Sequence, residues 1–343
     1  SVTNKFSLTR NWDVDLSADY QWNVLDATLS SFAYPVRHTA LVALASAYQW
    51  RGLKAQASVL GSFVTDRATL RNSGGERSRQ VSHLSKFTPA VFLSYQPWND
   101  RQFNVRTFSK RSFRMPTFND LYYTDFGNAS LKPEYATQYD LGAVYDFADG
   151  TGVLSTLSVS VDGYYNTINN KIIAVPKGTG QYRWMMMNIG RVKVRGVDVS
   201  TRLGLALPHG VALLGSLNYT YQRAQDYTDP TDCRDEAGTY KGQIAYIPWH
   251  SGSATLGGRW RGAELNYSFI YVGERYHNSS NILANYEQPW YTHDLSASYN
   301  FGWLGADMRL TAEVNNLLNQ QYDVIRNYPM PGRNYKFILK IDL

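Results

Sequence analysis

Residues 53–63 read LKAQASVLGSF, a segment in which apolar and polar side chains alternate. The apolar side of the alternation is formed by Leu53, Ala55, Ala57, Val59 and Phe63. A period of two is typical of a β-strand with one wet face and one apolar face, because successive strand side chains point to opposite faces. A run of about 11 residues also has the length with which a tilted strand crosses a membrane.

The same alternation recurs along the whole chain, most clearly in residues 153–162, 263–269 and 306–314 and in the terminal segment NYKFILKIDL, 334–343. The pattern predicts an all-β protein of about 14 strands. These strands are expected near residues 11–23, 38–50, 53–65, 85–97, 101–110, 135–147, 153–164, 191–205, 210–223, 248–260, 263–273, 290–300, 306–315 and 334–343.

The connections between the predicted strands alternate in length. Short turns such as Arg51-Gly52 and Arg261-Gly262 follow every second strand. The long polar connections lie near residues 24–37, 66–84, 111–134, 165–190, 224–247, 274–289 and 316–333. Short turns on one rim and long loops on the other are typical of an outer-membrane β-barrel, whose long loops face outward.

The tryptophans collect at strand ends. Trp50, Trp98 and Trp260 stand beside short turns, whereas Trp249 and Trp290 stand where long connections meet strands. Tryptophan prefers the two interfaces of a membrane, while a soluble β-sandwich has no reason to sort it this way. Together with a mean hydropathy of −0.39, this favours a transmembrane antiparallel β-barrel over a soluble β fold.

The charge of the chain permits an anionic partner. The formal net charge is +6, and the loop that carries Arg67, Arg71, Arg77 and Arg79 is basic. This loop is expected either to contact anionic lipopolysaccharide and outer-membrane lipid or to be solvated. Nucleic acid is not expected, because no basic run is combined with a nucleic-acid-binding motif.

Two segments about 200 residues apart carry more specific motifs. RSFRMPTFNDLYYTDFGNASLKPE, 111–134, is a connection between predicted strands, and VNNLLNQQYDVIRNYPMPGR, 314–333, precedes the last strand. Their motif residues are Phe113, Arg114, Pro116, Leu131, Pro133 and Glu134, and then Asn316, Leu317, Asn319, Tyr322, Pro331, Gly332 and Arg333. These two ordered boxes resemble those of TonB-dependent outer-membrane receptors, closest in character to vitamin B12 (cobalamin) and siderophore receptors.

The resemblance implies a protein of the bacterial outer membrane. Such receptors have a barrel of roughly 22 strands and an N-terminal plug that contacts the TonB complex. Residues 1–343 are therefore expected to be a single, partial domain, the C-terminal portion of that barrel. The plug and the first strands are expected to be absent from this chain, and the remaining N-terminal segment to be a partner of it.

By resemblance, the expected function is import of a scarce large ligand, energised by the TonB complex through the plug. Vitamin B12 or another corrinoid is the first expectation. A ferric-siderophore receptor of the same family and a passive porin or structural barrel remain alternatives. The chain is not expected to be an enzyme, since no hydrolase, zinc-protease or P-loop motif is present. The adjacent His250 and Ser251 raise the alternative of an outer-membrane lipid hydrolase.

Aromatic and basic residues in the long loops are candidates for binding the small-molecule ligand. They are Tyr182, Arg183, Trp184, Arg275, Tyr276 and Tyr286. Planar ligands such as corrins or catecholate siderophores fit aromatic and arginine faces. The alternatives are loops that pack on one another or a patch for a surface lipoprotein. Heme import would draw attention to His38 and His277, although no histidine lies within residues 113–134, where the resemblance to heme receptors would imply one.

The acidic loop offers weak candidates for a metal site. Asp226, Asp229 and Asp232 supply the oxygens that calcium prefers, and some cobalamin receptors use calcium in outer loops. Their spacing matches no EF-hand, so a solvated loop is the alternative. No other cofactor is expected, and the single Cys233 excludes an intrachain disulfide.

Overall fold

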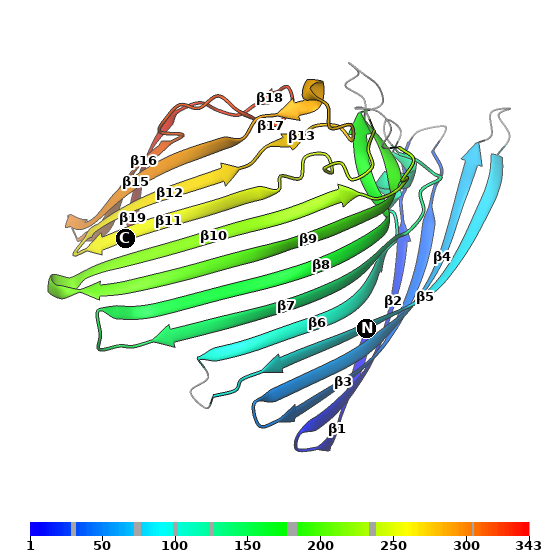
Figure 1. Cartoon of the computed structure of the whole chain (residues 1–343), viewed down its shortest axis with the longest axis horizontal. Helices are drawn as coiled ribbons and strands as arrows, with labels where there is room; N and C mark the ends of the chain where they lie inside the picture. The colour runs from blue at the N-terminus through cyan, green and yellow to red at the C-terminus, as the bar shows by residue number, and fades with distance from the viewer. Residues whose placement is uncertain are drawn as a thin grey trace. The chain divides into compact units, whose positions relative to one another are not determined.

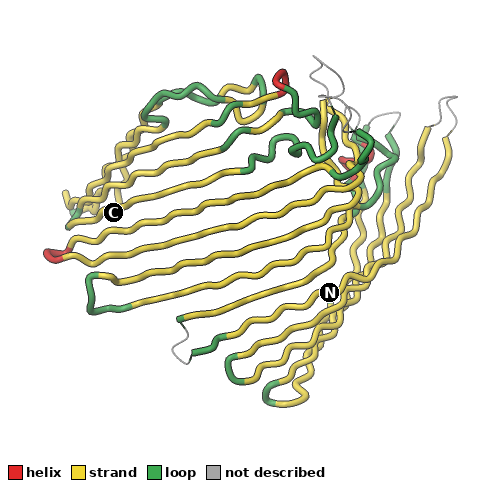
Figure 2. Tube along the Cα trace, in the orientation of Figure 1, coloured by secondary structure: helices red, strands yellow, loops and turns green. Residues whose placement is uncertain are grey.

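The computed structural model describes residues 1–28, 32–71, 77–98, 102–123, 127–176, 184–232, 238–303 and 305–342. Most of these residues are in strands (Figure 2). No helix among them is long and apolar enough to cross a membrane. The helical segments are short, namely α1 (Phe118–Tyr122), η1 (Pro208–Gly210) and η2 (Leu283–Asn285).

The strands follow one another in chain order (Figure 1). They are β1 (Val2–Thr9), β2 (Trp12–Val24), β3 (Val36–Trp50), β4 (Leu53–Arg71), β5 (Arg77–Tyr95), β6 (Phe103–Arg114), β7 (Glu134–Ala148), β8 (Leu154–Pro176), β9 (Trp184–Leu207), β10 (Val211–Asp226), β11 (His250–Trp260), β12 (Ala263–Val272), β13 (Arg275–Tyr276), β14 (Tyr286–Glu287), β15 (Trp290–Trp303), β16 (Ala306–Asn315), β17 (Asp323–Ile325), β18 (Tyr328–Pro329) and β19 (Asn334–Asp342).

Fifteen of these strands form one sheet in the order β1 to β12, β15, β16 and β19. Strand pairs such as β3–β4 and β15–β16 are antiparallel. The two short pairs β13–β14 and β17–β18 form separate ribbons in the connections. The predicted all-β antiparallel fold, which is that of a transmembrane β-barrel, is confirmed.

The structure has one more sheet strand than the sequence predicted. Strand β1 pairs with β2 through registers such as Val2↔Ala18 and Phe6↔Val14. Its alternation is interrupted by Asn4 on the apolar side, which explains why the pattern is weak. Strands β8 and β9 are 23 and 24 residues long, so they occupy much of the predicted loop 165–190. Their outer parts contain consecutive apolar residues, such as Ile172-Ile173 in β8 and Met185–Met187 in β9, so the alternation that indicates a strand is missing there.

Large apolar side chains are exposed on one face of the sheet. Leu44 pairs with Val59 and Ala40 with Phe63, and Leu44, Val59 and Phe63 are all exposed. The face that carries them is called the apolar face below. It exposes large apolar side chains that a soluble protein would bury, as a surface in contact with lipid does. The residues between them form the polar face, which carries Arg37 and Asp66 on the same strands.

The chain divides into two compact units. Unit 1 comprises residues 1–96, 106–140 and 165–193, and unit 2 comprises residues 97–105, 141–164 and 194–343. Unit 1 contains a small buried cluster of Leu121, Leu131 and Ile172, against which Tyr122 and Met186 pack. In unit 2, strands β10, β11, β12, β15 and β16 lie side by side (Figure 1).

Two short turns are closed by glycines that approach the next strand. In unit 1, the backbone N–H of Gln96 donates to the Gly52 carbonyl at 2.9 Å, and a Cβ on Gly52 would overlap the Gln96 carbonyl. In unit 2, a Cβ on Gly262 would lie 2.6 Å from the Asn300 carbonyl oxygen. Only glycine fits at such a close backbone approach.

Candidate functional site

The first motif segment begins where β6 ends. Phe113 and Arg114 are the last paired residues, and Pro116, which has no N–H, is fully buried. Helix α1 follows, and the sequence analysis did not predict it. Thr117 and Asp120 form a capping box, with the Asp120 N–H donating to Thr117 Oγ1 at 3.1 Å and the Thr117 N–H donating to Asp120 Oδ2 at 2.8 Å. The spacing Thr-x-x-Asp was the signal for this helix.

Arg37 fastens this segment to strands β3 and β4. Its Nε and Nη2 each donate to the Asp66 carboxylate at 2.7 Å, and its Nη1 donates to the Pro116 carbonyl at 2.9 Å. The guanidinium also lies 5.1 Å from the ring centroid of Phe118. Both charged side chains are largely buried, at 12% and 13% exposed. A bidentate, buried ion pair thus holds the start of the motif.

The end of the first motif segment is held by asparagines. Asn128 Nδ2 donates to the Met186 carbonyl at 2.9 Å. Asn188 accepts from the Lys132 N–H at 2.8 Å and donates to the Lys132 and Asn170 carbonyls. Glu134, the first residue of β7, accepts from the Ile172 N–H at 3.0 Å. Leu131 is part of the buried cluster, so this part of the motif packs inside unit 1.

The second motif segment is held by Asn316, which is 5% exposed and has a positive φ of 52°. Its Nδ2 donates to the Gln320 carbonyl at 2.8 Å, and its Oδ1 accepts from the Gln320 N–H at 2.9 Å. Its backbone N–H donates to Asp294 at 2.7 Å. Asparagine tolerates this left-handed backbone better than most residues. The motif asparagine therefore shapes a turn.

The rest of the second motif folds over this turn. Asn319, which also has a positive φ of 54°, accepts from the Arg333 N–H at 2.9 Å. A Cβ on Gly332 would lie 2.8 Å from Asn319 Oδ1. Tyr322 stacks on Trp290 at 4.5 Å between ring centroids, and burial raises the pKa of the Tyr322 hydroxyl. The Pro331 carbonyl accepts from Asn316, whereas Leu317 is exposed at 37%.

Arg275, a predicted ligand-binding residue, is only 3% exposed. Its guanidinium donates to the carbonyls of Asp323, at 2.7 Å, and of Val324 and Gln288. Burial lowers the pKa of Arg275, although Glu287 opposes the shift. The side chain thus fastens β17 to the β13–β14 ribbon and lies beneath the loop surface.

The other candidates differ in their exposure. Tyr276 and Tyr286 pair edge to face at 5.9 Å across β13 and β14. The Tyr286 hydroxyl donates to Glu274 at 3.1 Å, and its ring is 36% exposed. Trp184 is the first residue of β9 and is half-buried, not a residue of a loop tip. Tyr182 and Arg183 lie outside the described residues.

His277 joins the same loops in unit 2. Its Nδ1 lies 3.1 Å from Glu287 Oε1, and Arg326 Nη1 lies 2.7 Å from its Nε2. Burial, followed by the nearby Arg326 charge, lowers the pKa of His277 despite the opposing Glu287. The geometry fits a neutral ring that donates from Nδ1 to the carboxylate and accepts from the guanidinium at Nε2.

The calcium candidates are used in local turns. Asp226 accepts from the Thr228 N–H at 2.7 Å, Asp229 from the Thr231 N–H at 2.8 Å, and Asp232 from the Thr239 N–H at 3.0 Å. Within the described ranges, no three His, Cys, Asp or Glu side chains gather as a metal site would require. Calcium binding stays a prediction.

The polar face of unit 2 contains a groove of about 700 Å³. Polar and charged residues from β9 to β16 line it, among them Arg202, Asn266, Asp294 and Glu313. Towards the short turns, Glu264 lies 3.1 Å from Arg309 and 3.7 Å from Arg259. This face offers a polar wall with both signs of charge.

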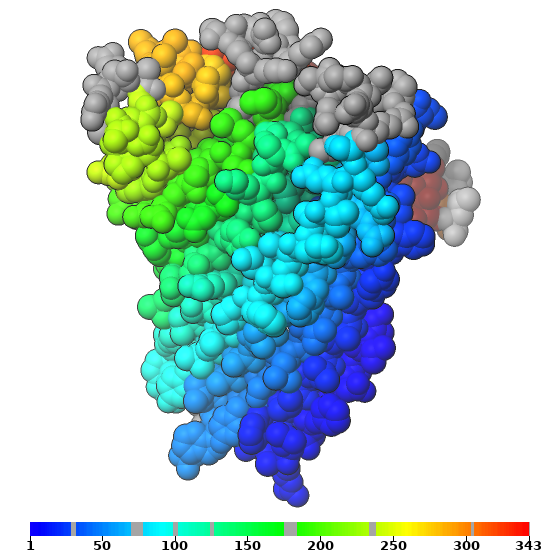
Figure 3. All heavy atoms as spheres, turned by 90° about the vertical axis from the view of Figure 1, so that its right-hand side faces the viewer, coloured from blue at the N-terminus to red at the C-terminus, as the bar shows by residue number. Residues whose placement is uncertain are grey.

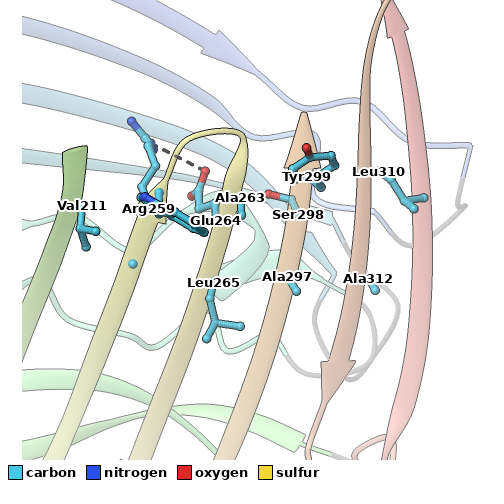
Figure 4. A pocket seen from close by; sticks show the side chains of 12 residues that line it. Val211, Arg259, Ala263, Glu264, Leu265, Ala297, Ser298, Tyr299, Leu310 and Ala312 are labelled. Carbon is cyan, nitrogen blue, oxygen red and sulfur yellow. Dashed lines mark ion pairs between the residues drawn. The ribbon is translucent and has the colours of Figure 1, made fainter. Parts of the chain in front are cut away.

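A second hollow of about 550 Å³ lies near the β11–β12 turn (Figure 4). Leu265, Ala297 and Ala312 are in register on adjacent strands, and large Tyr299 and Leu310 side chains flank these small residues. Figure 4 shows Arg259 and Glu264 pointing toward one another at this end. Because the aligned alanines belong to the apolar face, the hollow is separate from the polar groove.

His250 and Ser251 do not meet. They are successive residues at the start of β11, so their side chains point to opposite faces. His250 Nδ1 instead lies 2.8 Å from the hydroxyl of Tyr219. This arrangement lacks the nucleophile–base contact that a hydrolase needs.

The family model for "TonB dependent receptor-like, beta-barrel" matches residues 2–317. The chain belongs to the TonB-dependent receptor family. It is accordingly a protein of the bacterial outer membrane, as predicted. The first motif segment lies within the matched residues, and the second begins where the match ends.

Curated relatives and solved structures resemble this chain over most of its length. The vitamin B12 transporter BtuB of Photobacterium profundum is 25% identical over 65% of the chain and 32% of its own length. BtuB of Vibrio vulnificus (strain CMCP6) is 23% identical over 97% and 47%. The copper transporter OprC has a TM-score of 0.69 at 14% identity, over 99% of this chain and 55% of its own. The hemophore receptor HasR of Serratia marcescens has a TM-score of 0.66 at 16% identity, over 98% and 57%. The chain thus spans about half or less of the curated relatives' length.

Proposed function

We propose that this receptor imports a scarce large ligand across the outer membrane, that the ligand is vitamin B12 or another corrinoid, and that the TonB complex energises import. The observation that carries the proposal is the likeness to vitamin B12 transporters, which in one case extends over 97% of the chain at 23% identity. At this identity the ligand class is inferred, so siderophore import is the competing outcome.

The geometry supports a receptor with an outer capture surface and a polar route. In unit 2, the exposed Tyr286 ring lies on the loop ribbon that Arg275 fastens. The polar face of the same unit carries a groove lined by charged and amide side chains. A corrin ring would contact the loop aromatics and hydrogen-bond to polar groups at its edge. Selection would occur in the loops, and the polar face would form the route.

Energy coupling is tested by uptake. Cells that express the complete receptor should accumulate radiolabelled cyanocobalamin, and a protonophore should abolish accumulation while surface binding persists. Equal accumulation with and without the protonophore would instead support a passive porin. A parallel binding assay with ferric siderophores separates the two ligand classes, because tighter siderophore binding would reject the corrinoid assignment.

The aromatic candidates are tested in the same binding assay. The double substitution Tyr182→Ala/Trp184→Ala should weaken cyanocobalamin binding about tenfold, since each aromatic contact contributes on the order of 0.5–1.5 kcal/mol. Leu283→Ala is the matched control, because Leu283 is 88% exposed on a loop of unit 2. Unchanged binding in the double variant would remove both residues from the site.

We further propose that the receptor performs no covalent chemistry and needs no resident cofactor. The opposite orientations of His250 and Ser251 support the first part. Lipid hydrolase activity that is present in the purified receptor and lost in His250→Ala would overturn it.

A further inference from the structure

The first motif segment crosses the polar face of unit 1. Arg37 and Asp66 are paired in register on that face, and Arg37 donates to the Pro116 carbonyl at 2.9 Å. Tyr122 lies beside the same ion pair, since burial and then the Asp66 charge raise the pKa of its hydroxyl while the Arg37 charge opposes this. Residues 116–123, called the strap below, therefore lie over the polar face and not over the apolar face.

Strand β4, beneath the strap, is covered at its outer end. Val64 and Ala68 flank Asp66 on the polar face of this strand, and each is only 5% exposed. Lys54 and Gln56 lie on the same face near the short turn, and both are exposed. Side chains on the inner face of such a barrel are wet unless another segment covers them. The burial of Val64 and Ala68 thus places the strap at the outer end of this polar wall.

The far end of the strap rests on other strands of the same unit. Leu121 belongs to the buried cluster that includes Ile172 of β8, and Met186 of β9 packs against that cluster. Strands β5, β6 and β7 lie between β4 and β8 in the sheet. Figure 3 shows β1 to β5, the strands around the Arg37 end of the strap, as adjoining blue bands of one surface. The strap therefore bridges two parts of the wall of unit 1 and is held at both ends.

The exposed side of the strap carries an amide and an aromatic ring. The capping box uses two of the strap's side chains, and three others pack on the strands or on the Arg37 guanidinium. Asn119 and Tyr123 are exposed, the latter at 47%. The Tyr123 N–H donates to the Asn119 carbonyl at 3.2 Å, so the two side chains stand one helical turn apart. Trp184 shares a face of β9 with Met186, so a second aromatic ring lies on the side of β9 that meets the strap.

We propose that Asn119 and Tyr123 form a binding ledge on which a neutral, planar ligand with amide groups at its edge rests between the loops and the polar route. The Tyr123 ring stacks on the plane of the ligand, and the Asn119 amide exchanges hydrogen bonds with the ligand amides. A phenol and an amide offer no charge to an anionic ferric catecholate. The inference rests on the proposed function, because a corrinoid is such a ring. Arg37 is a positioning residue, which holds the ledge without touching the ligand.

The test measures equilibrium binding of radiolabelled cyanocobalamin to the complete receptor in detergent. Tyr123→Ala should weaken binding about fivefold through loss of one aromatic contact, and Asn119→Ala about threefold through loss of a hydrogen bond. Tyr123→Phe keeps the ring and should bind like the unaltered receptor. Tyr48→Ala is the matched control, because Tyr48 is similarly exposed, at 44%, but lies on the apolar face of β3. This control should leave binding unchanged, and tryptophan fluorescence checks that each variant is folded.

A labelling experiment checks direct contact. Tyr123→Cys, made together with Cys233→Ser, should react with a membrane-impermeant maleimide on intact cells, and saturating cyanocobalamin should slow this reaction severalfold. Leu283→Cys in the same background should react equally with and without cyanocobalamin. Equal affinity of the unaltered receptor and Tyr123→Ala would overturn the ledge, as would labelling that cyanocobalamin does not slow. An unaltered receptor that binds no cyanocobalamin would instead reject the proposed function, and the ledge's ligand with it.

Discussion

Arg37 fastens the start of the first motif segment with a buried charge, whereas Asn316 fastens residues 316–333 with a neutral amide. In unit 1 the bond is a bidentate ion pair between two strand residues, and the motif docks on it through the Pro116 carbonyl. In unit 2 the motif residue itself forms the bonds, within a turn of left-handed backbone. Both motifs shape connections, but the group that holds the start of the first motif lies outside it, whereas Asn316 belongs to the second motif.

This difference predicts how each segment responds when its holding group is removed. A buried ion pair is costly to break from one side, since the remaining charge loses its compensation. Removing a buried amide lowers the free energy of unfolding by less, because only neutral hydrogen-bonding groups remain unpaired. Damage to unit 1 should therefore reduce folding as a whole, whereas damage in unit 2 should loosen one connection.

The largest effect is expected for Asp66→Ala. Removing the carboxylate leaves the Arg37 guanidinium buried without its partner, so the free energy of unfolding should fall by about 3 kcal/mol. Urea denaturation of the detergent-solubilised receptor, followed by tryptophan fluorescence, measures this change. The control is Asp342→Ala, whose partner pair with Lys340 is exposed and should contribute less than about 1 kcal/mol. Similar losses in both variants would show that the Arg37 pair is not the main fastening.

A smaller and more local effect is expected for Asn316→Ala. The change leaves the Gln320 N–H and carbonyl without their side-chain partner and places alanine at a positive φ, for a cost of about 2 kcal/mol. Amide hydrogen exchange should quicken in residues 316–333 and stay unchanged in residues 117–123. Asn315→Ala is the control, because that amide donates to the exposed Asn334. Faster exchange in both segments would contradict the local character of the bond.

Acid should loosen the loops of unit 2 that His277 joins. The folded-state pKa of His277 lies below its ordinary value of 6.5, so near and below that pH the folded chain binds fewer protons than the unfolded chain. The free energy of unfolding therefore falls as the pH drops through 6.5 toward the lowered pKa. Hydrogen exchange, corrected for intrinsic rates, should show 277–287 loosening between pH 7.5 and 5.5. His277→Gln should remove this dependence, and a persistent dependence would assign it to another group.

The smallest effect is expected on removing calcium. Each of Asp226, Asp229 and Asp232 already accepts from a nearby backbone N–H, and local bonds lower the pKa of Asp229 and Asp232. Chelation with EDTA should change cyanocobalamin affinity less than twofold, or under about 0.4 kcal/mol. Binding measured with added calcium, with added magnesium and with EDTA checks this. A large loss that only calcium restores would instead identify a metal-dependent loop.

The membrane strands were predictable because alternation is a direct consequence of one lipid face. Segments such as Leu53 to Phe63 needed no tertiary information, since each second side chain had to be apolar. The outer halves of β8 and β9 were not predictable in this way, because consecutive apolar residues such as Ile172-Ile173 and Met185–Met187 replace the alternation. Helix α1 was not predicted, although the spacing of Thr117 and Asp120 indicates its start.

The residues of the candidate site and their place in outer connections were predictable from the sequence, but their contacts were not. The sequence placed Arg275 and Tyr286 in outer connections, yet only the fold shows that Arg275 is buried against the Asp323 carbonyl whereas Tyr286 is exposed. Likewise, Arg37 carries no motif of its own, and its role depends on the distant Asp66 and Pro116. Long-range partners of this kind cannot be inferred from spacing along one chain.

The glycines at the short turns also limit how the receptor can diverge. Gly52 and Gly262 each leave no room for a side chain beside the backbone of a neighbouring strand. Insertions or substitutions there would disturb the pairing of two hairpins at once, whereas a surface loop can lengthen at small cost. Sequence drift, epitope tags and new specificities should therefore accumulate on the long-loop rim, and the short-turn rim should change slowly.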